Sequence, residues 1–142
     1  FIRLCGDSPL IDPEIIKDAI EISIKNPEFD IITNTQKRTF PKGQSVEIVN
    51  IKSLKRLYQE NLSRDEQEHV TLGFYNRKDD FKIINFESNN NEFQNIQLSI
   101  DTQDDFELIN SIFNNYSSTE DLLKLRWDQL ALIYNNLIKK YN

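Results

Sequence analysis

Short apolar segments alternate with amphipathic segments along most of this chain, and this alternation restricts the possible folds more than any other feature. Strands are expected at residues 1–5, 29–33, 46–51, 81–86 and 96–100. Helices are expected over residues 13–25, from Ser53, over 64–75, from Thr102, and from 118 or 119 to the end. Strands that alternate with helices are typical of a parallel sheet covered on both faces. The sequence therefore predicts an α/β fold with a mostly parallel sheet.

Three of the expected helices begin with capping signals. These are Asp12 before Pro13, the capping box formed by Ser63 and Glu66, and the similar pair Thr102 and Asp105. In a capping box each side chain satisfies a backbone N–H group that the first helical turn leaves without a partner. These positions are the expected helix starts.

The charge balance argues against two classes of partner. The chain has 17 basic and 23 acidic residues, a net charge of −6, and no run of five Lys or Arg. Nucleic-acid binding driven by counterion release needs a basic surface, so no nucleic-acid partner is expected. No apolar stretch approaches the 18 residues of a membrane span, so no membrane insertion is expected either. The single Cys5 cannot form an internal disulfide, which favours a cytoplasmic location.

A length of 142 residues predicts a single domain. The sequence contains no Met, and its first five residues have the pattern of a strand without any preceding segment. We therefore expect the chain to be part of a longer protein, beginning inside its domain.

Two aspartates follow expected strands, Asp7 after the first and Asp101 after the last. Ligands of open α/β sheets bind beyond the carboxyl ends of the strands, where these two side chains could meet. Carboxylates, waters and substrate phosphates are the ligands that Mg²⁺ prefers. The alternative is that each aspartate only caps the loop or helix that follows it.

The polar segment 34–45 carries three cations, Lys37, Arg38 and Lys42, which either bind an anionic substrate or are ordinary solvated charges. His69 is the only histidine and falls on an expected helix, where it is either a structural residue or a catalytic one. Only three glycines are present, so no glycine-rich phosphate loop is expected.

Four motifs in order resemble those of the sugar-activating cytidylyltransferases. They are R-L-C-G-D-S-P-L-I-D-P at residues 3–13, R-T-F-P-K-G at 38–43, E-H-V-T at 68–71 and D-T-Q-D-D-F at 101–106. The spore coat polysaccharide group is the most similar, and the acylneuraminate and keto-deoxy-octulosonate enzymes are more distant. The resemblance extends to about Phe113.

This resemblance implies a Rossmann-like nucleotidyltransferase fold, of which the chain would form the C-terminal part. Such enzymes join CMP from CTP to a sugar and release pyrophosphate. By resemblance, Asp7 and Asp101 are the catalytic residues that hold Mg²⁺, while Arg38, His69 and Glu47 lie on the side of the sugar acceptor. The family also implies a homodimer.

Two departures from the family pattern affect these expectations. The family's G-S-x-R-L-P-G-K-like loop, which holds the triphosphate and the cytosine, does not occur in this chain, so the chain alone is expected to be inactive. Ser45 stands where the family usually has Asp, which leaves the acceptor open. Two alternatives therefore remain: a nucleotidyltransferase with another nucleotide or a sugar-phosphate acceptor, and a non-catalytic dimerisation module of the same fold.

Overall fold

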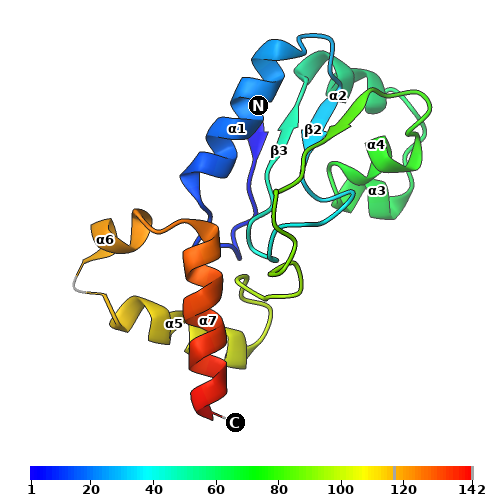
Figure 1. The fold of residues 1–142 in the computed structure, drawn as a ribbon. Coiled ribbons are helices and arrows are strands. Elements are labelled where there is room, and N and C mark those ends of the chain that lie inside the picture. Colours follow the sequence, from blue (N-terminus) through cyan, green and yellow to red (C-terminus); the bar gives the residue numbers. More distant parts are fainter. Residues whose placement is uncertain (117, 142) are drawn as a thin grey trace.

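The computed structural model describes residues 1–116 and 118–141, and its centre is a four-stranded mixed sheet (Figure 1). The strands are β1 (Ile2–Arg3), β2 (Ile31–Thr33), β3 (Glu47–Val49) and β4 (Ile83–Asn85), in the order β1-β3-β2-β4. β3 runs antiparallel to both β1 and β2, and only β2 and β4 pair in parallel. The α/β class is confirmed, whereas the expected mostly parallel pairing is wrong. The connection between β2 and β3 is a loop without a helix, whereas parallel neighbours are usually joined by a helical crossover.

The described residues also form seven helices. They are α1 (Pro13–Lys25), α2 (Ile51–Leu57), α3 (Arg64–Glu68), α4 (Leu72–Asn76), α5 (Gln103–Asn114), α6 (Thr119–Leu123) and α7 (Trp127–Tyr141). None of them is long and apolar enough to cross a membrane.

The predicted helix starts at Asp12, Ser63 and Thr102 are confirmed, and both capping boxes form. Three other predictions need correction. The helix expected over 64–75 is divided into α3 and α4, and the C-terminal helix is divided into α6 and α7. The strand expected over 96–100 is an irregular segment that forms only one isolated bridge, between Lys42 and Gln97.

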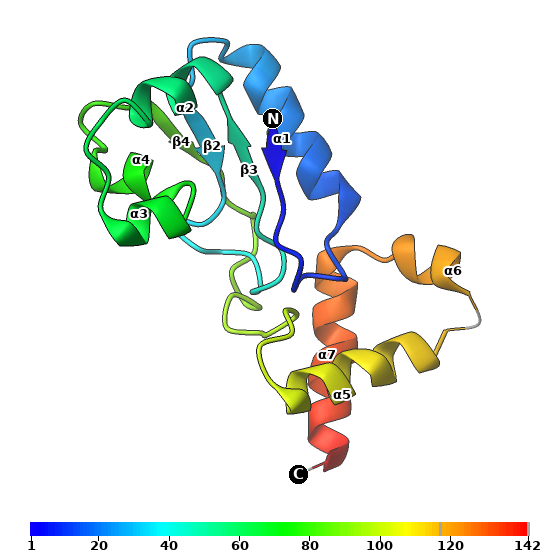
Figure 2. The same ribbon diagram turned by 180° about the vertical axis from the view of Figure 1, so that it is seen from behind.

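Helices cover both faces of the sheet, as predicted. Ile32 and Ile48 point to the face on which α1 packs, whereas Ile31 and Val49 point to the face covered by α2 and α4. The two apolar clusters that result lie on opposite sides of the sheet (Figures 1 and 2). β2 and β3 therefore bury residues on both faces, which explains their continuous apolar pattern.

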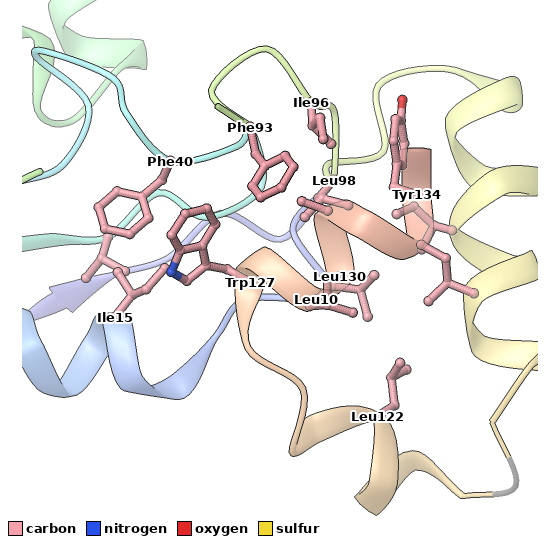
Figure 3. Packing of buried hydrophobic residues seen from close by; sticks show 14 of the residues in the cluster. Leu10, Ile15, Phe40, Phe93, Ile96, Leu98, Leu122, Trp127, Leu130 and Tyr134 are labelled. Carbon is pink, nitrogen blue, oxygen red and sulfur yellow. The ribbon is translucent and has the colours of Figure 1, made fainter. Parts of the chain in front are cut away.

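The helices α5, α6 and α7 extend beyond one end of the sheet (Figures 1 and 2). Trp127, at the start of α7, packs edge-on against Phe40 with ring centroids 5.2 Å apart and against Phe93 at 6.3 Å. Figure 3 shows these rings beside Ile15 of α1. The same packing therefore joins α7 to α1 and to the loop between β2 and β3.

Buried polar side chains fix the loops at this end of the sheet. The Asp12 carboxylate accepts hydrogen bonds from the backbone N–H of Glu14 in α1, at 2.8 Å, and of Trp127 in α7, at 3.0 Å. The Gln44 side chain accepts from the Asp12 N–H at 2.8 Å and donates to the Leu10 carbonyl at 2.7 Å. A buried amide with both of its groups satisfied fixes loop geometry, because any displacement leaves a polar group without a partner.

Candidate active site

Three segments that are distant in the sequence line one pocket of about 190 Å³ at this end of the sheet. The first follows β1, the second belongs to the loop between β2 and β3, and the third precedes α5. The lining residues are Cys5, Asp7, Ser8, Arg38, Lys42, Gly43, Ser45, Ser99 and Asp101. The pocket thus combines two carboxylates with two cations.

Backbone hydrogen bonds hold the three segments together. The Lys42 N–H donates to the Ile96 carbonyl at 2.9 Å, and the Leu98 N–H donates to the Lys42 carbonyl at 2.8 Å. The Ile100 N–H donates to the Asp7 carbonyl at 2.9 Å. The positions of Asp7, Lys42 and Asp101 are therefore set by the main chain.

Asp7 and Asp101 are brought to the same pocket, as the sequence predicted, and both are exposed. One oxygen of Asp7, Oδ1, accepts from the Ser8 hydroxyl at 2.9 Å, and Oδ2 of Asp101 accepts from Nε2 of Gln97 at 2.6 Å. Neither carboxylate forms an ion pair in the described part of the chain. The helix-capping alternative is not observed for either aspartate, because Asp12 and Thr102 occupy the capping positions.

The number and type of protein ligands at this pocket fit Mg²⁺ better than Zn²⁺. Within residues 1–116 and 118–141, no three His, Cys, Asp or Glu side chains gather closely enough to hold an ion. A catalytic zinc site uses three protein ligands, which this arrangement does not provide. Mg²⁺ is commonly held by one or two carboxylates, with waters and substrate phosphates completing the octahedron. The donor set of Asp7 and Asp101 is therefore suited to Mg²⁺.

Arg38 and Lys42 are the cationic members of the lining. One guanidinium nitrogen of Arg38, Nη1, donates to the Ser45 hydroxyl at 3.3 Å. The third cation of the same loop, Lys37, pairs instead with Glu87 at 2.7 Å and does not line the pocket. The structure thus separates three cations that the sequence could not distinguish.

His69 and Glu47 lie outside the pocket lining. His69 is exposed and follows the last residue of α3, where the expected continuous helix is interrupted. Glu47 is 4% exposed, and its carboxylate accepts from Arg3 at 2.6 Å and from the Tyr75 hydroxyl. Burial and the charge of Glu47 together raise the pKa of Tyr75 above its ordinary value. Glu47 therefore connects β3 to β1 and α4, and its carboxylate is already engaged.

Gln97 and Ser99 are site residues that the sequence analysis did not identify. Nε2 of Gln97 bonds both the Asp101 carboxylate and the Ser99 hydroxyl, the latter at 2.9 Å, and so orients Asp101. The signal was the alternation of Gln97, Ser99 and Asp101 with apolar residues. Such alternation places the three polar side chains on one side of an extended segment.

Several known proteins resemble this chain. A protein of Methanocaldococcus jannaschii that is named only as uncharacterized is 30% identical over 109 residues, which cover 76% of this chain and 43% of the relative. The spore coat polysaccharide biosynthesis protein SpsF of Bacillus subtilis is 28% identical over 125 residues, which cover 86% of this chain and 50% of the relative. The chain thus spans about half the length of these relatives.

The solved structure of a cytidylyltransferase from Leptospira borgpetersenii serovar Hardjo-bovis superposes with a TM-score of 0.81 at 26% identity. The superposition covers 99% of this chain and 56% of that one. In addition, residues 1–140 match the family described as cytidylyltransferase. This match includes all three segments of the pocket, with its two carboxylates and two cations. Because the match extends over nearly the whole chain, the chain belongs to the cytidylyltransferase family.

Proposed function

We propose that the protein containing this chain transfers CMP from CTP to a sugar and releases pyrophosphate. The observation that carries the proposal is the convergence of Asp7 and Asp101, from segments distant in the sequence, on one pocket that also holds Arg38 and Lys42. A site of this composition can accommodate a phosphoryl group on its carboxylate side through a divalent cation and on its cationic side directly. The similarity to a protein named for spore coat polysaccharide biosynthesis supports a sugar as the acceptor.

The roles of the residues follow from their chemistry. An oxygen of the acceptor attacks the α-phosphorus of CTP while the bond to pyrophosphate breaks. Asp7 and Asp101 would hold Mg²⁺, which when bound neutralises negative charge on the phosphoryl oxygens. Arg38 has further N–H groups besides the one donated to Ser45, and these orient the acceptor. Catalysis is then mainly positioning and charge neutralisation, as phosphoryl transfer requires.

Two residues expected at the acceptor have no part in this proposal. Glu47 is buried and its carboxylate is engaged, and His69 does not line the pocket. The contact between His69 and the acceptor stays a prediction, as do the homodimer and the cytoplasmic location. Light scattering of the intact protein in solution tests the dimer.

Replacement of Asp101 by Asn in the intact protein tests the proposal. The Asn side chain keeps the shape but removes the charge, so we expect turnover to fall by about a hundredfold or more. Asp104→Asn is the matched control, because Asp104 is an exposed acidic residue in the first turn of α5 and does not line the pocket. Near-normal turnover of Asp101→Asn would remove this role.

The nucleotide is tested separately. Release of pyrophosphate is measured with each of the four nucleoside triphosphates and a panel of sugars, and CTP is expected to support it. A preference for another nucleotide would favour the alternative nucleotidyltransferase. No release with any of them, together with no binding of CTP in the presence of Mg²⁺, would favour the non-catalytic module.

A further inference from the structure

We propose that Lys42 binds an oxyanion of a substrate, a phosphoryl group or a carboxylate, and that its backbone is held in place for this purpose by the segment that carries Asp101. The proposal rests on the proposed function and adds to it a residue that binds substrate.

The first observation concerns the charge of Lys42. Its side chain is exposed, lines the pocket, and forms no ion pair in the described part of the chain. Lys37, five positions earlier in the same loop, is paired with Glu87. Lys42 therefore lines the site without an ion-pair partner among the described residues.

The second observation concerns the backbone on either side of Lys42. Its N–H and its C=O both pair with the neighbouring segment, at Ile96 and Leu98. Gly43, the next residue, has a φ of +89°, and a Cβ atom there would lie 2.5 Å from the carbonyl carbon of Leu98. The two segments are packed so closely that only glycine fits. The Cα atom of Lys42 is thus fixed relative to the segment that ends at Asp101.

The third observation is the charge arrangement of the pocket as a whole. An anionic group that enters it meets the two carboxylates, which repel it, and the repulsion is strongest where water is excluded. Arg38 and Lys42 are the positive charges of the lining that can offset this repulsion. One of the Arg38 nitrogens is already committed to Ser45. Among the described residues no side-chain hydrogen bond or ion pair engages the ammonium group of Lys42, and a lysine acts on phosphates as a point charge.

Two sources supply the same ligand chemistry. A phosphoryl group comes from the nucleotide or from pyrophosphate, and a carboxylate comes from an acidic sugar. Binding of inorganic pyrophosphate in Mg²⁺-containing buffer reports on the first source and can be followed by calorimetry. Binding of glucuronate reports on the second and can be followed by ligand-observed NMR.

The experiment compares three variants of the intact protein. Lys42→Ala is expected to weaken the binding of pyrophosphate, of glucuronate, or of both by about tenfold, which corresponds to about 1.4 kcal/mol. Lys42→Arg keeps the charge and should stay within about threefold of the wild type. Lys37→Ala is the matched control and should leave both affinities unchanged. Thermal unfolding checks that the variants are folded, which is expected because the Lys42 side chain is exposed.

The pattern of loss identifies the source of the oxyanion. Equal binding of both probes by Lys42→Ala and the wild type would overturn the proposal, and so would the failure of both probes to bind the wild type. These outcomes differ from a failure of the proposed function. Binding that depends on Lys42 in a protein without activity on CTP would refute only the function, whereas CTP activity with unchanged binding by Lys42→Ala would refute only the role of Lys42.

Discussion

Gly43 is the residue at which the packing of the pocket is tightest. It is the one residue with positive φ in the described part of the chain, and it lies against the backbone of Leu98 and Ser99. A side chain here would both strain the backbone and separate the two segments. The fit of the loop against its neighbour therefore depends on the absence of a single Cβ atom.

We expect Gly43→Ala to destabilise the intact protein. We also expect it to lower the activity by more than the fraction of unfolded protein would explain. A residue in a sparsely populated φ/ψ region costs on the order of 1–3 kcal/mol, and the overlap with Leu98 adds to this cost. The midpoint of urea unfolding measures the stability, and pyrophosphate release under conditions in which the variant stays folded measures the activity.

Gly6→Ala serves as the stability control for this prediction. A Cβ atom at Gly6 would have nothing within 4 Å, so we expect a change well below that of Gly43→Ala. Equal unfolding midpoints for Gly43→Ala and the wild type would show that the loop relaxes at little cost and would contradict the close fit.

The sequence indicated the positions of some site residues but not the surroundings of others, because those surroundings come from distant parts of the chain. Asp7 and Asp101 were assigned to one edge of the sheet because each follows an expected strand. The two side chains do line one pocket, although β1 ends at Arg3 and residues 96–100 form no regular strand. Glu47 was assigned to substrate because nothing local shows that Arg3 and Tyr75 enclose it. Lys37 and Lys42 were indistinguishable for the same reason, since Glu87, which pairs with Lys37, is distant in the sequence.

At the scale of elements, the helix starts marked by caps were predicted correctly. The helix expected from Ser53 begins instead at Ile51, and helix interruptions were not predicted. A cap is a local interaction, so Ser63 with Glu66 and Thr102 with Asp105 could be recognised from their spacing alone. The interruption between α3 and α4 coincides with a long-range contact, in which the buried Thr71 hydroxyl donates to Glu47 at 3.2 Å. Tertiary contacts of this kind can interrupt a helix although the helical periodicity of the apolar residues continues through the interruption.

Glu66 joins α3 to α4 and makes this pair sensitive to acid. Its carboxylate accepts from Arg77 at 2.5 Å and from the Ser63 N–H at 2.8 Å. The hydrogen bond from Arg77, and after it the bond from Ser63, lowers the pKa of Glu66 from 4.5 to about 2. The ionised form is therefore favoured by folding. Its stabilising contribution is complete above about pH 5 and disappears as the pH falls through 2.

We expect Glu66→Gln to destabilise the intact protein at pH 7 and to reduce the loss of stability between pH 4.5 and pH 2. The Gln side chain does not titrate, so the difference from the wild type should shrink as the pH falls through this window. Urea unfolding at several pH values between 2 and 7 measures it.

Glu68→Gln is the control for the pH experiment, because Glu68 is an exposed neighbour on α3. It should follow the pH dependence of the wild type. Parallel curves for Glu66→Gln and the wild type over the whole range would refute the assignment of this acid sensitivity to Glu66.

At the scale of the whole molecule, the order of the strands was the feature least accessible to the sequence. Each strand was recognisable by its apolar pattern, and burial on both faces was correctly expected for β2 and β3 but wrongly for β1, which is an exposed edge strand. Pairing is a long-range property, however, and β3 lies between β1 and β2 although it follows both in the chain. The antiparallel direction of β3 accompanies a connection to β2 that contains no helix, and the polar residues of this connection alone do not reveal the path of the chain.

This strand order leaves β1 at one edge of the sheet with exposed apolar side chains. Ile2 and Leu4 are 40% and 44% exposed, and Phe1 is 50% exposed. β1 bonds to β3 on one side, and in the described residues no strand pairs with its other side. An apolar edge strand with free N–H and C=O groups is a template for pairing with a second chain.

Produced as a separate polypeptide of 142 residues, the chain should therefore self-associate through β1. Sedimentation velocity over a range of concentrations should show dimers or larger species. Ile2→Lys should shift the distribution toward the monomer, because a lysine on an edge strand opposes pairing through its charge. Ile24→Lys is the matched control, since Ile24 is 73% exposed and lies on α1, outside the sheet. A monomer at all concentrations would exclude self-association through β1. An equal effect of both substitutions would also exclude β1 as the contact, because it would indicate nonspecific contacts between exposed apolar residues.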